Sequence, residues 1–134
     1  RSMTDKNYDF DLGGMTPDAQ RSAANDAGQV LHMDEKAGQT VAKELLPALD
    51  LINEALQIAQ QAGNVEGFGA LNTGQEAMAH YRKQAPEMVT RLTALKADCQ
   101  AQIDHVLAME LLYNNMDAYN AGRVFDHKLT VEYK

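Results

Sequence analysis

Apolar residues recur at three- and four-residue spacing along two long stretches of the chain, a pattern typical of amphipathic helices. Thr16 precedes Pro17, and a Thr cap followed by Pro at the first helical position marks a helix start. No cluster of turn residues follows, so we expect one helix over residues 17–62. Gly28 should weaken this helix, and Pro47 should kink it without ending it, because the apolar pattern continues beyond the proline.

Residues 63–73, with the sequence GNVEGFGALNT, form the one clear break. Thr73 and Glu76 have the spacing of a capping box, which opens a second helix expected over residues 74–121. Gly122 is placed to follow its last residue. Two arms of nearly equal length around a glycine-rich connection predict an all-α fold, a long antiparallel helical hairpin.

The segments outside the arms, residues 1–16 and 122–134, have a different pattern. Apolar and polar residues alternate over 7–12 and again over 128–133, and this alternation is compatible with two short strands. We favour the simpler interpretation, in which both segments are disordered or loosely docked tails.

The apolar surface of the two arms is wider than a two-helix hairpin can cover. An ordinary one-sided helix has an apolar arc of little more than about 100°, whereas apolar positions extend well beyond that arc on both arms. The surplus predicts an interface with a second hairpin, and two hairpins paired in this way form a dimeric four-helix bundle. The alternative is a monomer whose tails fold back over this surface. The residues expected at the interface are Leu46, Leu51, Ile58, Leu107, Leu111, Leu112 and Met116.

The composition and the net charge of the chain limit the kinds of partner that it can bind. The 134 residues suffice for one domain, and the net charge of −7 disfavours binding to nucleic acid, whose phosphates repel an acidic protein. No stretch is long and apolar enough to span a membrane, and the amino-terminal segment lacks the apolar run of a Sec signal peptide. The single cysteine, Cys99, cannot form an internal disulfide.

The four histidines do not form a recognisable catalytic or metal site. Residues Ala77 and Gln102 stand where the Glu-x-x-His motifs of a di-iron bundle would place glutamates before His80 and His105. His32, in the sequence LHMDEKAG, has a superficial likeness to the phosphorylated histidine of phosphotransfer bundles, but the lysine and glycine are out of register. We therefore expect no catalytic residue, metal or cofactor.

The turn GFGALNTG and the helix end YNNMD give the sequence a family likeness. Over residues 17–121 the chain resembles the small helical-hairpin substrates of actinobacterial type VII (ESX) secretion, which include WXG-type proteins and relatives with a Phe-Gly turn. The resemblance implies that Phe68 and Gly69 form the turn. It also implies that Tyr113 and Asp117 form a Tyr-x-x-x-Asp signal read by the secretion ATPase. Residues four apart share one helical face, so the pair would present one compact patch.

The resemblance implies a non-enzymatic protein that is made in the cytoplasm and reaches the cell envelope or exterior without a Sec signal. Its expected partners are a homologous helical hairpin, as homo- or heterodimer, and the secretion ATPase. Two other functions stay open at this point. One is a cytoplasmic helical adaptor or chaperone that binds a partner helix, and the other is a histidine phosphotransfer bundle that uses His32.

Overall fold

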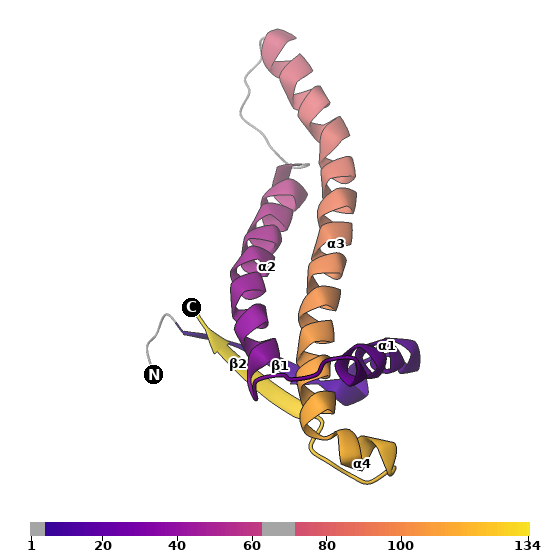
Figure 1. The fold of residues 1–134 in the computed structure, drawn as a ribbon. Coiled ribbons are helices and arrows are strands. Elements are labelled where there is room, and N and C mark those ends of the chain that lie inside the picture. Colours follow the sequence, from indigo (N-terminus) through magenta and orange to yellow (C-terminus); the bar gives the residue numbers. More distant parts are fainter. Residues whose placement is uncertain (1–4, 63–71) are drawn as a thin grey trace. The chain divides into compact units, whose positions relative to one another are not determined.

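The computed structural model describes residues 5–62 and 72–134, and the predicted turn residues Phe68 and Gly69 lie outside them. The described chain is mostly helical, with a small two-stranded sheet (Figure 1). In chain order the elements are β1 (Lys6–Asp11), the 3-10 turn η1 (Leu12–Gly14), α1 (Pro17–Gly28), α2 (Ala37–Ala62), α3 (Asn72–Asn114), α4 (Met116–Asn120) and β2 (Lys128–Tyr133).

Two helix boundaries agree with the sequence prediction. Thr16 caps α1, because its hydroxyl accepts a hydrogen bond from the backbone amide of Ala19 at 3.2 Å. At the other end, Gly122 adopts a positive φ of 67°, and the next amide, that of Arg123, returns to the carbonyl of Ala118 at 2.8 Å. A left-handed residue there satisfies carbonyls that the end of α4 would leave without partners.

The prediction of a single helix over residues 17–62 is wrong, because the structure has two helices there, α1 and α2. Gly28 ends α1 instead of only weakening it. The amides of Gln29 and Val30 close the end with bonds to the carbonyls of Asp26 and Ala27. The chain is helical again from Ala37, and α2 then continues through Pro47, as predicted.

The second helix, expected over residues 74–121, is also divided. It ends at Asn114, and Asn115, with φ −122° and ψ 27°, separates α3 from α4. The side-chain amide of Asn115 donates to the carbonyl of Leu111 at 2.8 Å. Asparagine offers the backbone such local alternatives to helical bonding, which favours a break.

The chain forms two compact units. Unit 1 comprises Arg1–Pro47 and Gln100–Lys134, and unit 2 comprises Ala48–Cys99. Unit 1 therefore contains β1, η1, α1, α4 and β2, together with one end each of α2 and α3.

The sheet of unit 1 overturns the expectation of loosely docked tails. β1 and β2 pair in antiparallel register, with Tyr8 opposite Val131 and Phe10 opposite Leu129 (Figure 1). Phe10 and Val131 are buried, whereas the alternate positions are exposed. On that exposed side, the Thr130 hydroxyl donates to Asp9 at 3.0 Å. The alternation seen in the sequence thus gives the sheet one buried and one solvated face.

The carboxyl-terminal part of α3, residues 100–114, is packed against three other elements of unit 1. β1 contacts it through Tyr8, α1 contacts it through Asp26, and α2 contacts it through Gly38. A helix enclosed from several sides buries apolar residues around most of its circumference. The buried core of unit 1 consists of Phe10, Leu12, Ala23, Ala27, Ala42, Leu46, Ile103, Leu107, Ala108, Leu111, Leu112 and Val131.

This enclosure corrects the predicted partner interface. The expected interface residues that are buried in the core of unit 1 are Leu46, Leu107, Leu111 and Leu112. A side chain covered by its own chain offers no surface to a partner, so these residues belong to the fold. Met116 in α4 is half-buried. Leu46, Leu107, Leu111 and Leu112 are therefore covered within unit 1 itself.

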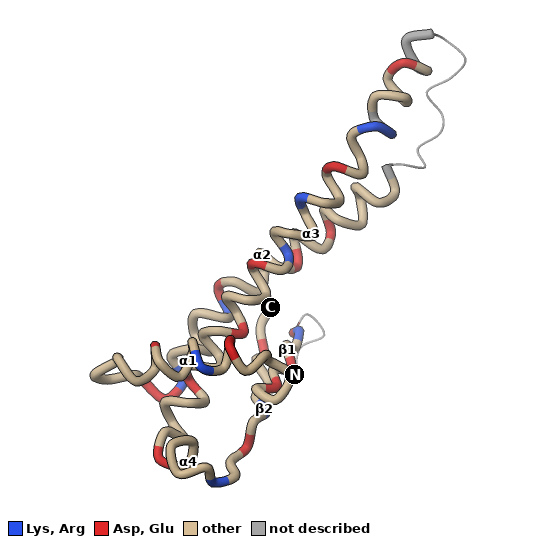
Figure 2. Tube along the Cα trace, turned by 90° about the vertical axis from the view of Figure 1, so that its right-hand side faces the viewer, with Lys and Arg blue, Asp and Glu red and all other residues tan. Residues whose placement is uncertain are grey.

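Unit 2 contains the remaining lengths of α2 and α3. Lys and Arg alternate with Asp and Glu along α3 (Figure 2). Among the described residues of this unit, the buried hydrophobic side chains are Leu49, Ala59 and Ala85. The described part of unit 2 thus has few buried apolar side chains.

Candidate functional site

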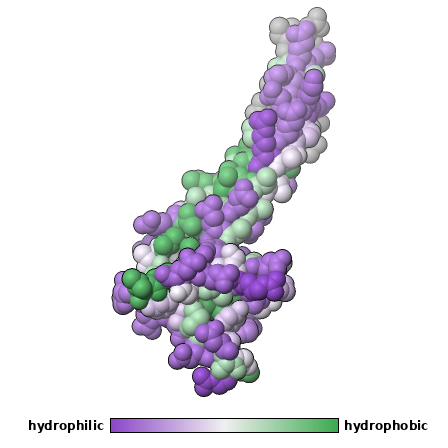
Figure 3. Space-filling model, turned by 45° about the vertical axis from the view of Figure 1, so that its right-hand side comes forward, coloured by the Kyte–Doolittle hydropathy of each residue, from purple (hydrophilic) through white to green (hydrophobic). Residues whose placement is uncertain are grey.

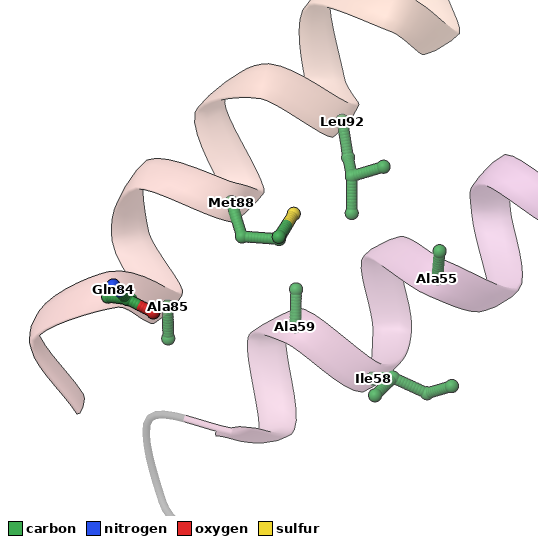
Figure 4. Close-up of a pocket in the computed structure, with 7 residues that line it drawn as sticks. All are labelled: Ala55, Ile58, Ala59, Gln84, Ala85, Met88 and Leu92. Carbon is green, nitrogen blue, oxygen red and sulfur yellow. The ribbon is translucent and has the colours of Figure 1, made fainter. Parts of the chain in front are cut away.

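An apolar groove lies between α2 and α3 within unit 2. It has a volume of about 400 Å³, and the residues that line it are Ala55, Ile58, Ala59, Gln84, Ala85, Met88 and Leu92. Ala55 and Ala59 face Met88 and Leu92 across the groove, whereas Ile58 points away from α3 (Figure 4). Alanine side chains on α2 are too short to fill the space, and this leaves the groove open.

Large apolar side chains stand exposed in the same unit. Leu51 and Ile58 on α2 are 65% and 67% exposed, and Met88 and Leu95 on α3 are 49% and 50% exposed. The members of each pair are seven residues apart, so each pair lies along one face of its helix. Hydrophobic side chains also reach the surface between hydrophilic ones in the space-filling view (Figure 3). We call the pair Leu51 and Ile58 on α2 and the pair Met88 and Leu95 on α3 the exposed rows.

The exposed rows overlap only partly with the predicted interface. Leu51 and Ile58 were expected there, and both are exposed. Met88 and Leu95 were not among the residues expected there, although both are 49–50% exposed. Their recurrence at seven residues is visible in the sequence, but the sequence does not show that the short side chains of Ala55 and Ala59 lie opposite Met88.

The two residues of the predicted secretion signal are brought together in an unexpected way. Tyr113 lies at the end of α3 and Asp117 lies in α4, so the break at Asn115 separates them. The prediction that both residues share one face of a continuous helix is therefore wrong. Both nevertheless line one open cavity of about 390 Å³, together with Arg123 and Val124 among others. Val124 is 98% exposed. Whether a secretion ATPase reads this pair stays a prediction.

The histidines lie in separate environments. His32 is in the segment between α1 and α2, and its ring contacts Asp34 at 3.1 Å with both side chains largely exposed. A phosphotransfer histidine would be on a helix, which His32 is not. His105 Nε2 lies 2.8 Å from a carboxylate oxygen of Asp26. Over residues 5–62 and 72–134, no group of three or more His, Cys, Asp or Glu side chains is arranged to hold a metal ion.

Cys99 is half-buried near the end of unit 2. Burial raises the pKa of its thiol above the ordinary value of 9.0. Since the thiolate is the reactive form, a raised pKa makes this cysteine a poor nucleophile. The side chain is therefore best understood as a packing residue.

Two further observations concern membrane-spanning helices and similarity to known proteins. Within the described residues, none of the helices combines the length and the apolar character needed to cross a bilayer. No protein-family model, curated protein or solved structure matches the chain.

Proposed function

We propose that the protein is a non-enzymatic interaction module in which α2 and α3 form a helical hairpin that pairs with a second hairpin, homologous or identical. The observation that carries this proposal is the pair of exposed rows on unit 2. Leu51 and Ile58 on one helix, and Met88 and Leu95 on the other, leave large apolar surfaces in contact with water. Large apolar side chains that recur in this way on the surface are characteristic of protein–protein interfaces.

The energetics support a helical partner. Full burial of a Leu, Ile or Met side chain contributes roughly 1.5–3 kcal/mol. Among the described residues of unit 2, Leu49 is the one large apolar side chain that is buried, so covering Leu51, Ile58, Met88 and Leu95 would add substantially to its apolar core. Residues spaced by seven fit the heptad geometry of a four-helix assembly.

The charges of unit 2 do not by themselves select an orientation of the partner. The described charged residues that α2 contributes to unit 2 are acidic, namely Asp50 and Glu54. Those that α3 contributes are of both signs: the cations are Arg82, Lys83, Arg91 and Lys96, and the acids are Glu76, Glu87 and Asp98.

We further propose that the hairpin serves type VII secretion, as a substrate or as a secretion-targeting partner. The resemblance in the turn GFGALNTG and in YNNMD motivates this assignment. The shared cavity of Tyr113 and Asp117 gives the proposed signal an open place at which an ATPase can bind. The protein would then be made in the cytoplasm and exported without a Sec signal.

Light scattering coupled to size exclusion tests the pairing. The 14.7 kDa chain is measured alone and after co-expression with a candidate homologous hairpin. We expect a dimeric mass in one of the two cases, and we expect Leu51→Glu with Ile58→Glu to abolish it. Leu31→Glu, at a residue that is 101% exposed outside unit 2, is the matched control. A monomer under both conditions would contradict the pairing.

Export is tested separately in the encoding organism. The protein should accumulate in the culture filtrate, and Tyr113→Ala or Asp117→Ala should retain it in the cell. Tyr119→Ala, also in α4, serves as the control. If the wild type stays in the cytoplasm but pairs with another protein's helix, the adaptor function replaces the secretion function.

A further inference from the structure

The sheet of unit 1 has a strand edge that the proposed function does not use. Among the described residues the sheet consists of β1 and β2 alone, so β2 pairs with a strand along one side only (Figure 1). The other side of such a strand carries amide and carbonyl groups that can pair with a strand of another chain. We call this side of β2 the outer edge.

The register with β1 shows which backbone groups point to the outer edge. The amide of Leu12 donates to the carbonyl of His127 at 2.9 Å and continues the ladder of the sheet. Hydrogen-bonded pairs alternate with other pairs along an antiparallel ladder. Lys128, Thr130 and Glu132 therefore turn their backbone groups away from β1. Within residues 5–62 and 72–134, no backbone group is hydrogen-bonded to Thr130 or Glu132 from this outer side.

The charges along the outer edge are complementary to themselves. On either side of Thr130 the sign alternates in the order Asp126, Lys128, Glu132, Lys134, and all five side chains are exposed. When two copies of β2 run antiparallel with Thr130 opposite Thr130, each Lys128 faces Glu132 of the second copy. The same register sets Asp126 opposite Lys134. Opposite charges directly across a strand pair stabilise the pair, whereas like charges destabilise it.

The neighbouring registers lack this match. Sliding one strand by two residues in either direction again brings outward backbone groups opposite each other. One slide sets Asp126 against Glu132, and the other sets Lys128 against Lys134. A parallel pair in register would set every charge against its own copy. The charges thus favour the antiparallel register centred on Thr130 over its neighbours.

We propose that the outer edge of β2 pairs with the outer edge of β2 in a second copy of this chain, in the antiparallel register centred on Thr130, so that two sheets become one of four strands. In the single chain the Lys128 amide donates to Oδ1 of Asp126 at 3.1 Å. In the pair this amide donates to the carbonyl of Glu132 of the second copy, and the Asp126 carboxylate turns to Lys134.

This surface is separate from the exposed rows, because β2 belongs to unit 1. A strand of six residues offers a small contact area, so the association is weak. We expect it at high protein concentration, well above that of a protein eluting from size exclusion. The loss of dimeric mass that we expect for Leu51→Glu with Ile58→Glu is therefore unaffected.

The test is a charge exchange, measured by sedimentation equilibrium of the full chain up to high concentration. Leu51→Glu with Ile58→Glu is present throughout, so that pairing through unit 2 does not contribute. Lys128→Glu and Glu132→Lys should each weaken the association at least about tenfold, because two facing pairs become like-charged. An equimolar mixture of the two variants should associate as tightly as the parent chain, because acid again faces base at both positions. Arg123→Glu, an exposed charge outside the strand, should have no effect.

A disulfide trap gives a second measurement. The Cα atoms of a hydrogen-bonded antiparallel pair lie about 5.5 Å apart, within the range of about 4.4–6.8 Å that a disulfide spans. Thr130→Cys, with Cys99→Ala to remove the native thiol, should therefore form a covalent dimer under mild oxidation. Asp9→Cys in the same background is the control, because Asp9 lies opposite Thr130 on the exposed face of β1 and not at the outer edge of β2. It should form the dimer at least about tenfold more slowly.

Three results would overturn the proposal. They are a monomeric parent chain at the highest soluble concentration, equal association of the single variants and their mixture, and equal rates of disulfide formation for Thr130→Cys and Asp9→Cys. In Lys128→Glu the new carboxylate faces Asp11 on β1, so circular dichroism must first show that this variant folds. If it does not fold, Glu132→Lys and the disulfide trap decide the question.

Discussion

The carboxylate of Glu110 on α3 caps the first turn of α2 through Gln39. One carboxylate oxygen accepts the backbone amide of Gln39 at 3.0 Å, and the other accepts its side-chain amide at 2.8 Å. Glu110 is only 3% exposed. An anion is favourable at a helix start because the amides there lack partners and the helix dipole is positive.

Replacing Glu110 by Ala should therefore destabilise unit 1. Hydrogen bonds to a charged group contribute roughly 1.5–3 kcal/mol, so we expect a loss of about 2–3 kcal/mol in the free energy of unfolding. Urea unfolding followed by circular dichroism measures it. Glu44→Ala, at an exposed position on α2, should change the free energy by less than about 0.5 kcal/mol. Equal effects of the two substitutions would show that the cap contributes nothing.

Gly38 is required by the close approach of α2 to α3. A Cβ atom added there would lie 2.3 Å from the backbone oxygen of Val106 and 2.9 Å from Cβ of Glu110. Gly38→Ala should destabilise the protein by about 1–3 kcal/mol, although Ala is the better helix former by about 1 kcal/mol. Gly28→Ala is the control, since no atom lies within 4 Å of its added Cβ. Thermal unfolding that ranks Gly38→Ala as the more stable variant would contradict the close contact.

Substitutions at Leu107 and at Leu51 should have different effects, because Leu107 lies in the core and Leu51 lies in the proposed interface. Leu107 is fully buried in unit 1, so Leu107→Ala should lower the free energy of unfolding by about 2–5 kcal/mol. Leu51 is 65% exposed, and Leu51→Ala should change the stability of the monomer by less than about 0.5 kcal/mol. Denaturant unfolding of both variants at two protein concentrations distinguishes a loss of core packing from a loss of pairing. A cost of Leu51→Ala that appears only at high concentration would reflect lost pairing.

Asp104 should make stability depend on pH. Because burial raises its pKa in the folded state above 3.8, the folded state favours the protonated carboxyl. The resulting stabilisation is fully present below that value and is lost as the pH rises through the raised pKa. Asn cannot titrate and still accepts a bond from Tyr8. The stability of Asp104→Asn relative to the wild type should therefore increase over this rise in pH, as measured by urea unfolding at several pH values. A difference independent of pH would contradict the shift.

Local signals in the sequence predicted local structure well. Thr16 and Pro17 gave the start of α1, and Gly122 gave the left-handed residue after α4. These predictions succeed because a cap or a positive φ depends on a few neighbouring atoms.

The long-range contacts were not predictable in the same way. The start of α2 depends on Glu110, which is 71 residues from Gln39. Leu107 is fully buried in unit 1, which combines two segments that are distant in the sequence, residues 1–47 and 100–134. For the candidate site, Leu51 and Ile58 were expected in a partner interface and are exposed, whereas Met88 and Leu95 are equally at the surface but were not expected there. Periodicity gives the face of a helix, but it does not say which neighbour covers that face.

The pairing of Lys6 with Tyr133 fixes the order of events during synthesis on the ribosome. β1 emerges early, but it has no strand to pair with until β2 has left the exit tunnel. Such distant pairings fold slowly, because a large loop must close before the contacts form. The sheet of unit 1 therefore forms only after β2 has been translated, whereas the contacts of β1, α1 and α2 with α3 do not require β2.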